Sequence, residues 1–140
     1  MKIVTILFCL VIQLTAFDTL TASKIFDKLF VAIVPHEMVY VYTQDTTQKE
    51  VIKQALNLSL TTNIDSADIV LVTQFKDVPN DTENRVLFST SYTIFLQNPS
   101  VIGAFYWNKG RIKIQFLRSR LEEKNIVLPS LFEKFILDEL

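Results

Sequence analysis

The middle of the chain carries the run Asp68-Ile69-Val70-Leu71-Val72-Thr73, in which four aliphatic residues follow one another without a polar break. A strand with one wet face alternates apolar and polar side chains, whereas a strand covered on both faces reads as a continuous apolar run. Strands of the second kind belong to parallel sheets. Apolar runs at Met38–Tyr42 and Arg85–Ser89 predict two further strands on either side of it.

Helical patterns alternate with these strands. Apolar residues at helical spacing predict a helix from Ala22 to Ile33, which Pro35 ends because the residue before a proline avoids helical angles. A second helix is predicted from Thr47 to about Asn57, since Thr47-Gln48-Lys49-Glu50 has the spacing of a capping box. Such alternation is typical of a parallel α/β sheet.

The last third of the chain predicts a hairpin. Ile102–Trp107 and Arg111–Leu117 flank Asn108-Lys109-Gly110, and Gly110 can adopt the positive φ that a tight turn needs. Apolar and polar residues alternate along the second strand, which predicts one buried and one wet face. Two helices are predicted after the hairpin, over residues 118–125 and 128–137.

These elements predict an α/β fold. Its central sheet is mostly parallel, with the antiparallel C-terminal hairpin at the edge and helices flanking it in a three-layer-like sandwich. A chain of 140 residues suits one domain, which we place at residues 17–140.

Residues 1–16 have the pattern of a secretory signal peptide. Lys2 is followed by an apolar stretch and then by the small residue Ala16, with cleavage as late as Ala22 as the alternative. A buried first helix or strand is the competing interpretation. The apolar stretch is too short to cross a bilayer comfortably. Cys9 falls inside the leader, so the exported domain would contain no cysteine and would depend on its core for stability.

The scarce residue types exclude several kinds of site. Gly103 and Gly110 are the only glycines, whereas a phosphate-binding loop needs two or three within a few residues. The single histidine, in His36-Glu37, lacks the second histidine of a zinc-protease motif, so no metal site is predicted. The 14 basic and 15 acidic residues nearly cancel, which gives no indication of nucleic-acid binding. We therefore expect a binding or regulatory module without catalysis or cofactor.

Three stretches, taken in order, resemble parts of a known family. They are Ile25-Phe26-Asp27-Lys28-Leu29-Phe30-Val31-Ala32-Ile33-Val34-Pro35, Ser66-Ala67-Asp68-Ile69-Val70-Leu71-Val72, and Ile102-Gly103-Ala104-Phe105 through Phe116. They resemble the opening helix, the central strand and the terminal hairpin of the YfiR-like family of periplasmic regulators, and the tail over residues 120–135 continues the match. The chain departs from the family at Val34, where tryptophan is common, and in having no cysteine after the leader, so disulfide control is not carried over.

The resemblance implies a small periplasmic protein that binds the periplasmic domain of an inner-membrane signalling protein. The best known family members restrain a diguanylate cyclase and so change cyclic-di-GMP output. Any enzymatic output would then lie in the partner. A homodimer is a further association open to the chain, whereas neither nucleic acid nor direct membrane insertion of the mature chain is expected.

An alternative function is a small-molecule-binding sensory or carrier domain. Ligands of parallel α/β sheets bind beyond the carboxyl ends of the strands. The polar residues predicted at those ends are Gln44, Asp45, Thr46, Thr73, Gln74, Ser89 and Ser91. The competing interpretation is that such residues only cap helices and turns.

Aromatic residues near an arginine are the candidates for a partner interface, because such anchors are frequent in protein interfaces. The residues concerned are Tyr92, Phe95, Tyr106, Trp107 and Arg111. They would equally serve to close the edge of the core. Arg118 and Arg120 are expected to form a solvated charged face with nearby glutamates.

Overall fold

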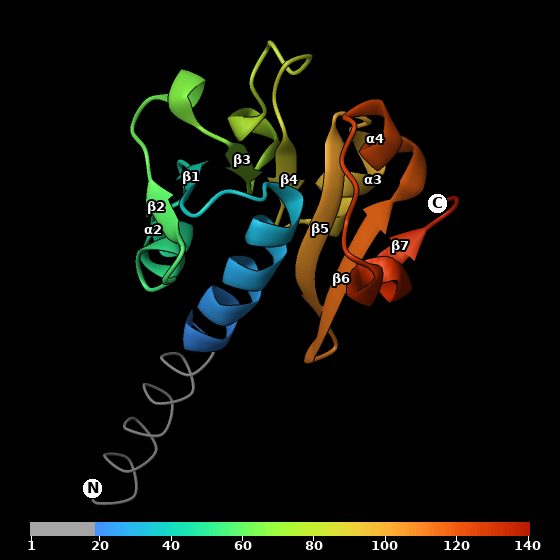
Figure 1. The fold of residues 1–140 in the computed structure, drawn as a ribbon, viewed down its shortest axis with the longest axis horizontal. Coiled ribbons are helices and arrows are strands. Elements are labelled where there is room, and N and C mark those ends of the chain that lie inside the picture. Colours follow the sequence, from blue (N-terminus) through green and yellow to red (C-terminus); the bar gives the residue numbers. More distant parts are fainter. Residues whose placement is uncertain (1–18) are drawn as a thin grey trace, which may run out of the picture.

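A single seven-stranded sheet organises residues 19–140, the part of the chain that the computed structural model describes (Figure 1). The predicted signal peptide lies outside these described residues. The strand order is β2-β1-β3-β4-β5-β6-β7, and every neighbouring pair is parallel except β5–β6. The strands are β1 (Val39–Tyr42), β2 (Leu58–Leu60), β3 (Ile69–Val72), β4 (Leu87–Ser89), β5 (Val101–Asn108), β6 (Arg111–Leu117) and β7 (Ile136–Leu137). The predicted fold class, a mostly parallel sheet with one antiparallel pair on the C-terminal side, is confirmed, but the hairpin is not the edge of the sheet because β7 pairs with the outer side of β6.

Helices cover both faces of the sheet. The helix of residues 19–33 and α2 (Thr46–Lys53) pack on one face, and α3 (Tyr92–Gln97) packs on the other. The short helix α4 (Arg118–Glu123) follows β6 directly. Three 3₁₀ helices complete the described chain: η1 (Ile64–Ser66), η2 (Phe75–Asp77) and η3 (Ser130–Phe135).

Strand β3 is buried on both faces, as its continuous apolar run predicts. Ile69 and Leu71 belong to the core beneath the helix of residues 19–33, whereas Val70 and Val72 belong to the core beneath α3. A strand with polar side chains on one face would supply no apolar side chains to one of these two cores.

A cluster of phenylalanines fixes the helix of residues 19–33 to the sheet. The ring centroids of Phe26 and Phe30 lie 6.3 and 5.4 Å from that of Phe88 on β4, both in edge-to-face geometry. Phe105 lies 5.0 Å from Phe26, and Phe116 lies 5.8 Å from Phe88. Edge-to-face pairs add about 0.5–1.5 kcal/mol each beyond the burial of their area. The amphipathic helix predicted from Ala22 to Ile33 therefore buries its aromatic face on β4 and β5.

Gly103 lies at an irregularity in β5 that lets two phenylalanines approach. Leu87 pairs with Val101 but Phe88 pairs with Gly103, so the register shifts between these pairs. On the other side Gly103 pairs with Phe116. A Cβ atom at Gly103 would lie 2.6 Å from Phe116 Cδ1 and 2.7 Å from the carbonyl oxygen of Gln115. The Phe116 ring thus occupies the space of the missing side chain.

Gly103→Ala is expected to lower the free energy of unfolding by about 2 kcal/mol, because the backbone carbonyl cannot move aside without disturbing the ladder. Urea unfolding followed by circular dichroism measures the loss. Gly110→Ala is the control, since a Cβ there meets nothing within 4 Å and the cost comes only from a φ of +76°. Equal stability of the Gly103→Ala variant and the parent chain would contradict the steric argument.

The turn of the hairpin has the predicted backbone conformation. Asn108 pairs with Arg111, and the two residues between them, Lys109 and Gly110, have φ values of 52° and 76°. Two consecutive positive φ angles match the right-handed twist of the flanking strands.

The predicted helix over residues 128–137 is wrong. This segment forms η3 and then β7, whose two residues pair with Phe116 and Leu117 of β6. Its apolar spacing suits a helix, but the outer edge of β6 offers unpaired backbone groups that a strand can satisfy. Arg118 holds the segment in place by donating hydrogen bonds to the carboxylates of Glu133 and Asp138. These bonds, the one to Glu133 first, raise the pKa of Arg118 above its usual range.

Arg120 does not belong to the solvated charged face that was expected. Its side chain is buried, and Nη1 lies 2.6, 3.1 and 2.8 Å from the carbonyl oxygens of Phe95, Asn98 and Val101. Its guanidinium also stacks over the Phe95 ring at 5.0 Å. Burial lowers the pKa of this guanidinium. Arg120 therefore donates to two carbonyls at the end of α3, which lack helical partners, and to one at the start of β5.

Candidate binding surfaces

Most of the polar residues predicted to meet at the strand ends hold local structure. Asp45 Oδ1 accepts a hydrogen bond from Gln48 N at 2.9 Å and caps α2, and Ser91 Oγ caps α3 by accepting from Ile94 N at 3.3 Å. The capping residue of α2 is thus Asp45, and the predicted cap at Thr47 is wrong. An aspartate suits this position because its carboxylate accepts from the free N–H groups of the first turn.

Ser89 and Thr73 are also engaged with the backbone or with neighbours. Ser89, which is fully buried, donates through Oγ to Val72 O at 2.8 Å and accepts from Ser91 N at 3.0 Å. Thr73 Oγ1 accepts from Thr90 Oγ1 at 3.1 Å. These contacts join the ends of β3 and β4, which is the structural role that the sequence left open as the alternative.

Four of the predicted ligand residues do meet in one small pocket. Gln44, Asp45, Thr46 and Gln74 line it together with Lys76 and Asp77. Its volume is about 190 Å³, whereas pockets that bury a drug-sized molecule measure roughly 300–1,000 Å³. Thr73, Ser89 and Ser91 do not line it.

A larger pocket lies beside the carboxyl end of β4, on the face covered by the helix of residues 19–33. Its volume is about 360 Å³, and its walls come from that helix, α2 and β5. The lining residues are Thr19, Ala22, Thr47, Gln48, Val51, Thr90, Phe105, Tyr106 and Trp107. Of these residues, Tyr106 and Trp107 were predicted for a partner interface. The lining residues come from distant parts of the sequence, and the packing of the helices on the sheet brings them together.

Gln48 has an unusual position in this pocket. It occupies the third residue of α2, one turn before the buried Val51 and Ile52, and so faces the sheet. A glutamine at this position often accepts a hydrogen bond from the N–H of the capping residue. Here the N–H of Asp45 donates to Thr43 Oγ1 at 3.3 Å instead. Gln48 Oε1 is left buried without a hydrogen-bond partner among residues 19–140. In the sequence, the spacing Asp45-x-x-Gln48 was the signal that could have identified Gln48.

The end of the hairpin exposes an apolar pair, Trp107 and Ile112. These residues face each other across β5 and β6, and they are 45% and 38% exposed. The register leaves this end of the hairpin without other strand neighbours, because β4 reaches only Ala104 and β7 pairs only with Phe116 and Leu117. Figure 1 shows the hairpin extending past both neighbouring strands. The Trp107 ring packs edge-to-face on Phe105 at 4.9 Å and remains partly exposed.

Tyr92, Tyr106 and Arg111 lie on the opposite face of the same hairpin. Tyr106 alternates with Trp107 along β5, and its ring packs 5.3 Å from that of Tyr92 on α3. Arg111 is exposed and pairs across the strands with Asn108. Burial, and after it the neighbouring Tyr92, raises the pKa of Tyr106. The predicted interface residues therefore divide between two faces of one hairpin.

Phe95 is not an interface residue. Its side chain is fully buried in the core beneath α3, under the guanidinium of Arg120. Phe95 was predicted to be partly exposed, but α3 turns it inward beside Ile94 while Tyr92 remains exposed.

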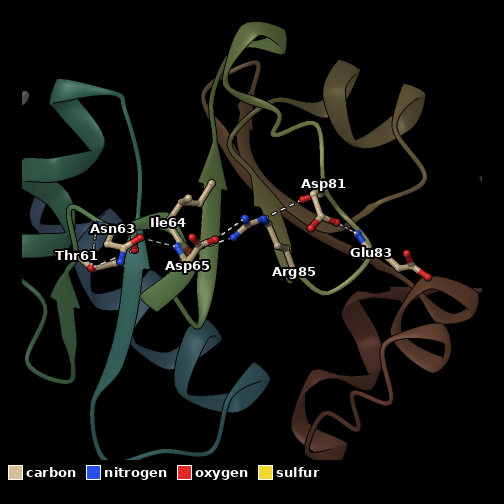
Figure 2. Close-up of polar contacts among 7 residues, drawn as sticks. All are labelled: Thr61, Asn63, Ile64, Asp65, Asp81, Glu83 and Arg85. Carbon is tan, nitrogen blue, oxygen red and sulfur yellow. Dashed lines mark hydrogen bonds and ion pairs between the residues drawn. The ribbon is translucent and has the colours of Figure 1, made fainter.

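The acidic residues near η1 bind separate partners. Figure 2 shows Arg85 between Asp65 and Asp81: Nη2 donates to Asp65 Oδ1 at 2.8 Å and Nε donates to the carbonyl of Asp81 at 2.9 Å. Asp68 instead accepts from Tyr40 N at 2.9 Å. Arg85 thus ties η1 to the loop before β4, which is a structural network.

His36 lies at the surface, with Nδ1 3.8 Å from Asp68 Oδ1. Within residues 19–140 no group of three or more histidine, cysteine, aspartate or glutamate side chains is arranged to hold a metal ion. In the same range, no helix has the length and apolar character needed to span a membrane.

Comparisons with known proteins extend the description of the fold only. No protein-family model and no curated protein matches the chain. Among solved structures, the fold is similar to that of a conserved domain protein from Vibrio cholerae O1 biovar El Tor strain N16961, with a TM-score of 0.53 and 9% sequence identity. The match covers 78% of this chain and 57% of that one. At this identity the likeness concerns the fold and carries no function with it.

Proposed function

We propose that the chain is an exported regulatory protein that binds the periplasmic domain of an inner-membrane signalling protein, such as a diguanylate cyclase. The observation that carries the proposal is the exposed pair Trp107 and Ile112 at the free end of the β5–β6 hairpin. The likeness of the sequence to YfiR-like regulators supports the class of partner.

The chemistry of the hairpin end suits a protein partner. Tryptophan is among the residues that most often dominate binding energy at interfaces, above all where its ring enters a pocket of the partner. Lys109 is exposed in the turn beside the apolar pair, and Arg111 and Lys113 are exposed on the opposite face of the same hairpin. A partner surface that presents an apolar recess with acidic residues at its rim would match both features, and the charges would speed association.

Binding of this kind regulates by selecting a conformation. A protein that binds one state of a receptor more tightly than the other shifts the receptor toward that state, by as much as the difference in affinity. No catalytic step in the bound regulator is needed, and the signalling output remains in the partner.

The burial of Ala22 bears on where the leader would be cleaved. Ala22 is 5% exposed and belongs to the core, and residues 19–22 form part of the helix that covers the sheet. Cleavage after Ala22 would remove this part of the helix. We therefore propose cleavage at Ala16, which keeps it.

The test is capture of the partner from solubilised membranes by the purified, tagged protein, followed by mass spectrometry. We expect recovery of one integral membrane protein that has a periplasmic domain and a cytoplasmic signalling domain. Ile112→Asp is expected to weaken its binding about 30-fold, the loss typical of a residue central to an interface.

Val127→Asp is the matched control, because Val127 is 90% exposed and belongs to the segment between α4 and η3, outside the hairpin strands. The control should bind like the parent chain. Recovery of no membrane signalling protein, or equal binding of the Ile112→Asp and Val127→Asp variants, would contradict the proposal.

A further inference from the structure

The pocket of about 360 Å³ beside the carboxyl end of β4 has the size and the composition of a small-molecule site. Apolar walls come from Ala22, Val51 and Phe105, and the Trp107 ring forms part of its mouth. All of its described lining residues are uncharged. A charged ligand would lose its hydration here without finding an opposite charge, so the pocket favours a neutral molecule.

The polar groups in the pocket offer acceptors. Gln48 lines the pocket, and its Oε1 has almost no accessible surface and no partner among the described residues, so a ligand reaches this oxygen when the side chain turns toward the pocket. The Thr90 hydroxyl donates its proton to Thr73 Oγ1, which leaves its lone pairs free to accept. A buried acceptor without a donor destabilises the protein. A molecule that donates an N–H to this acceptor therefore binds more favourably than one whose hydrogen bond only replaces a bond to water.

We propose that this pocket binds a neutral, planar small molecule whose NH₂ group donates a hydrogen bond to Gln48 Oε1. The flat body of the molecule lies against the aromatic walls of β5, and the NH₂ group points toward α2. An aromatic primary amide matches the site well, since its donor and acceptor are both complementary to the amide of a glutamine side chain. This site shares Trp107, but not Ile112, with the proposed partner surface, and the binding of a small molecule goes beyond that function.

Benzamide is the first probe, and N,N-dimethylbenzamide is its control because it has the same ring without the donor. Trp107 is the only tryptophan in the chain, so its fluorescence reports on the mouth of the pocket. We expect benzamide to change this fluorescence saturably and to raise the melting temperature by mass action. N,N-dimethylbenzamide is expected to bind at least tenfold more weakly, as expected for the loss of one hydrogen bond in a buried site.

Gln48→Met tests the residue itself, since methionine keeps the length of the side chain and removes the acceptor. The variant is expected to melt no lower than the parent chain and to bind benzamide about tenfold more weakly. Gln97→Met, an exposed glutamine at the end of α3, is the matched control and should bind like the parent.

Three results would overturn the proposal. The first is the absence of any saturable response to benzamide at millimolar concentration. The second is equal binding of benzamide and N,N-dimethylbenzamide to the parent chain, a comparison that holds even where the Gln48→Met variant fails to fold. The third is unchanged affinity for benzamide in a folded Gln48→Met variant.

Discussion

Phe88→Ala is expected to lower the free energy of unfolding by about 4 kcal/mol, within the range observed when a large buried aromatic residue is truncated. Phe88 is fully buried on β4, and its ring contacts Phe30 and Phe116 at centroid distances of 5.4 and 5.8 Å. Removing it leaves a cavity where the helix of residues 19–33 meets the sheet. The surrounding rings cannot close this cavity without moving the helix.

Urea unfolding followed by circular dichroism measures this loss. Phe75→Ala is the matched control, because Phe75 is 53% exposed and its truncation opens no cavity. A loss of unfolding free energy below about 1 kcal/mol for Phe88→Ala would contradict the assignment of Phe88 to the centre of the core.

Arg120→Met is expected to lower the free energy of unfolding by about 3 kcal/mol. The change removes charged hydrogen bonds to the carbonyls of Phe95, Asn98 and Val101, and it leaves buried acceptors without a donor. Methionine fills a similar volume, so the loss reports on the hydrogen bonds more than on packing.

Arg118→Met is the companion variant on the same helix. Arg118 also makes ion pairs, with Glu133 and Asp138, but its partners are more than half exposed to solvent. Water and salt screen such pairs, so the loss should be much smaller than for Arg120→Met. Equal losses in urea unfolding would contradict the assignment of Arg120 as a buried structural residue.

Sequence reasoning succeeds where a local pattern determines the structure. The continuous run from Ile69 to Val72 has the composition of a doubly covered strand, and the fold contains one there. Gly110 predicts the turn because few other residues tolerate its φ of 76°. In both cases the deciding physics lies within a few neighbouring residues.

Sequence reasoning fails where partners distant in the sequence decide the outcome. Residues 136–137 pair with β6 because its outer edge is free, which no pattern within the segment indicates. Arg120 is buried because the end of α3 needs a donor, although its neighbours in the sequence are charged. The orphaned oxygen of Gln48 becomes apparent only once Thr43 is seen to take the N–H that would otherwise satisfy it.

The most direct test of the proposed function is site-specific photo-crosslinking in living cells. A photoreactive phenylalanine analogue replaces Trp107 at the hairpin end, and in a parallel strain it replaces Val127, which is exposed in the segment between α4 and η3. We predict that the probe at Trp107 forms a covalent adduct with one membrane signalling protein and that the probe at Val127 does not. Adducts to that protein from neither position, or equally from both, would contradict the account.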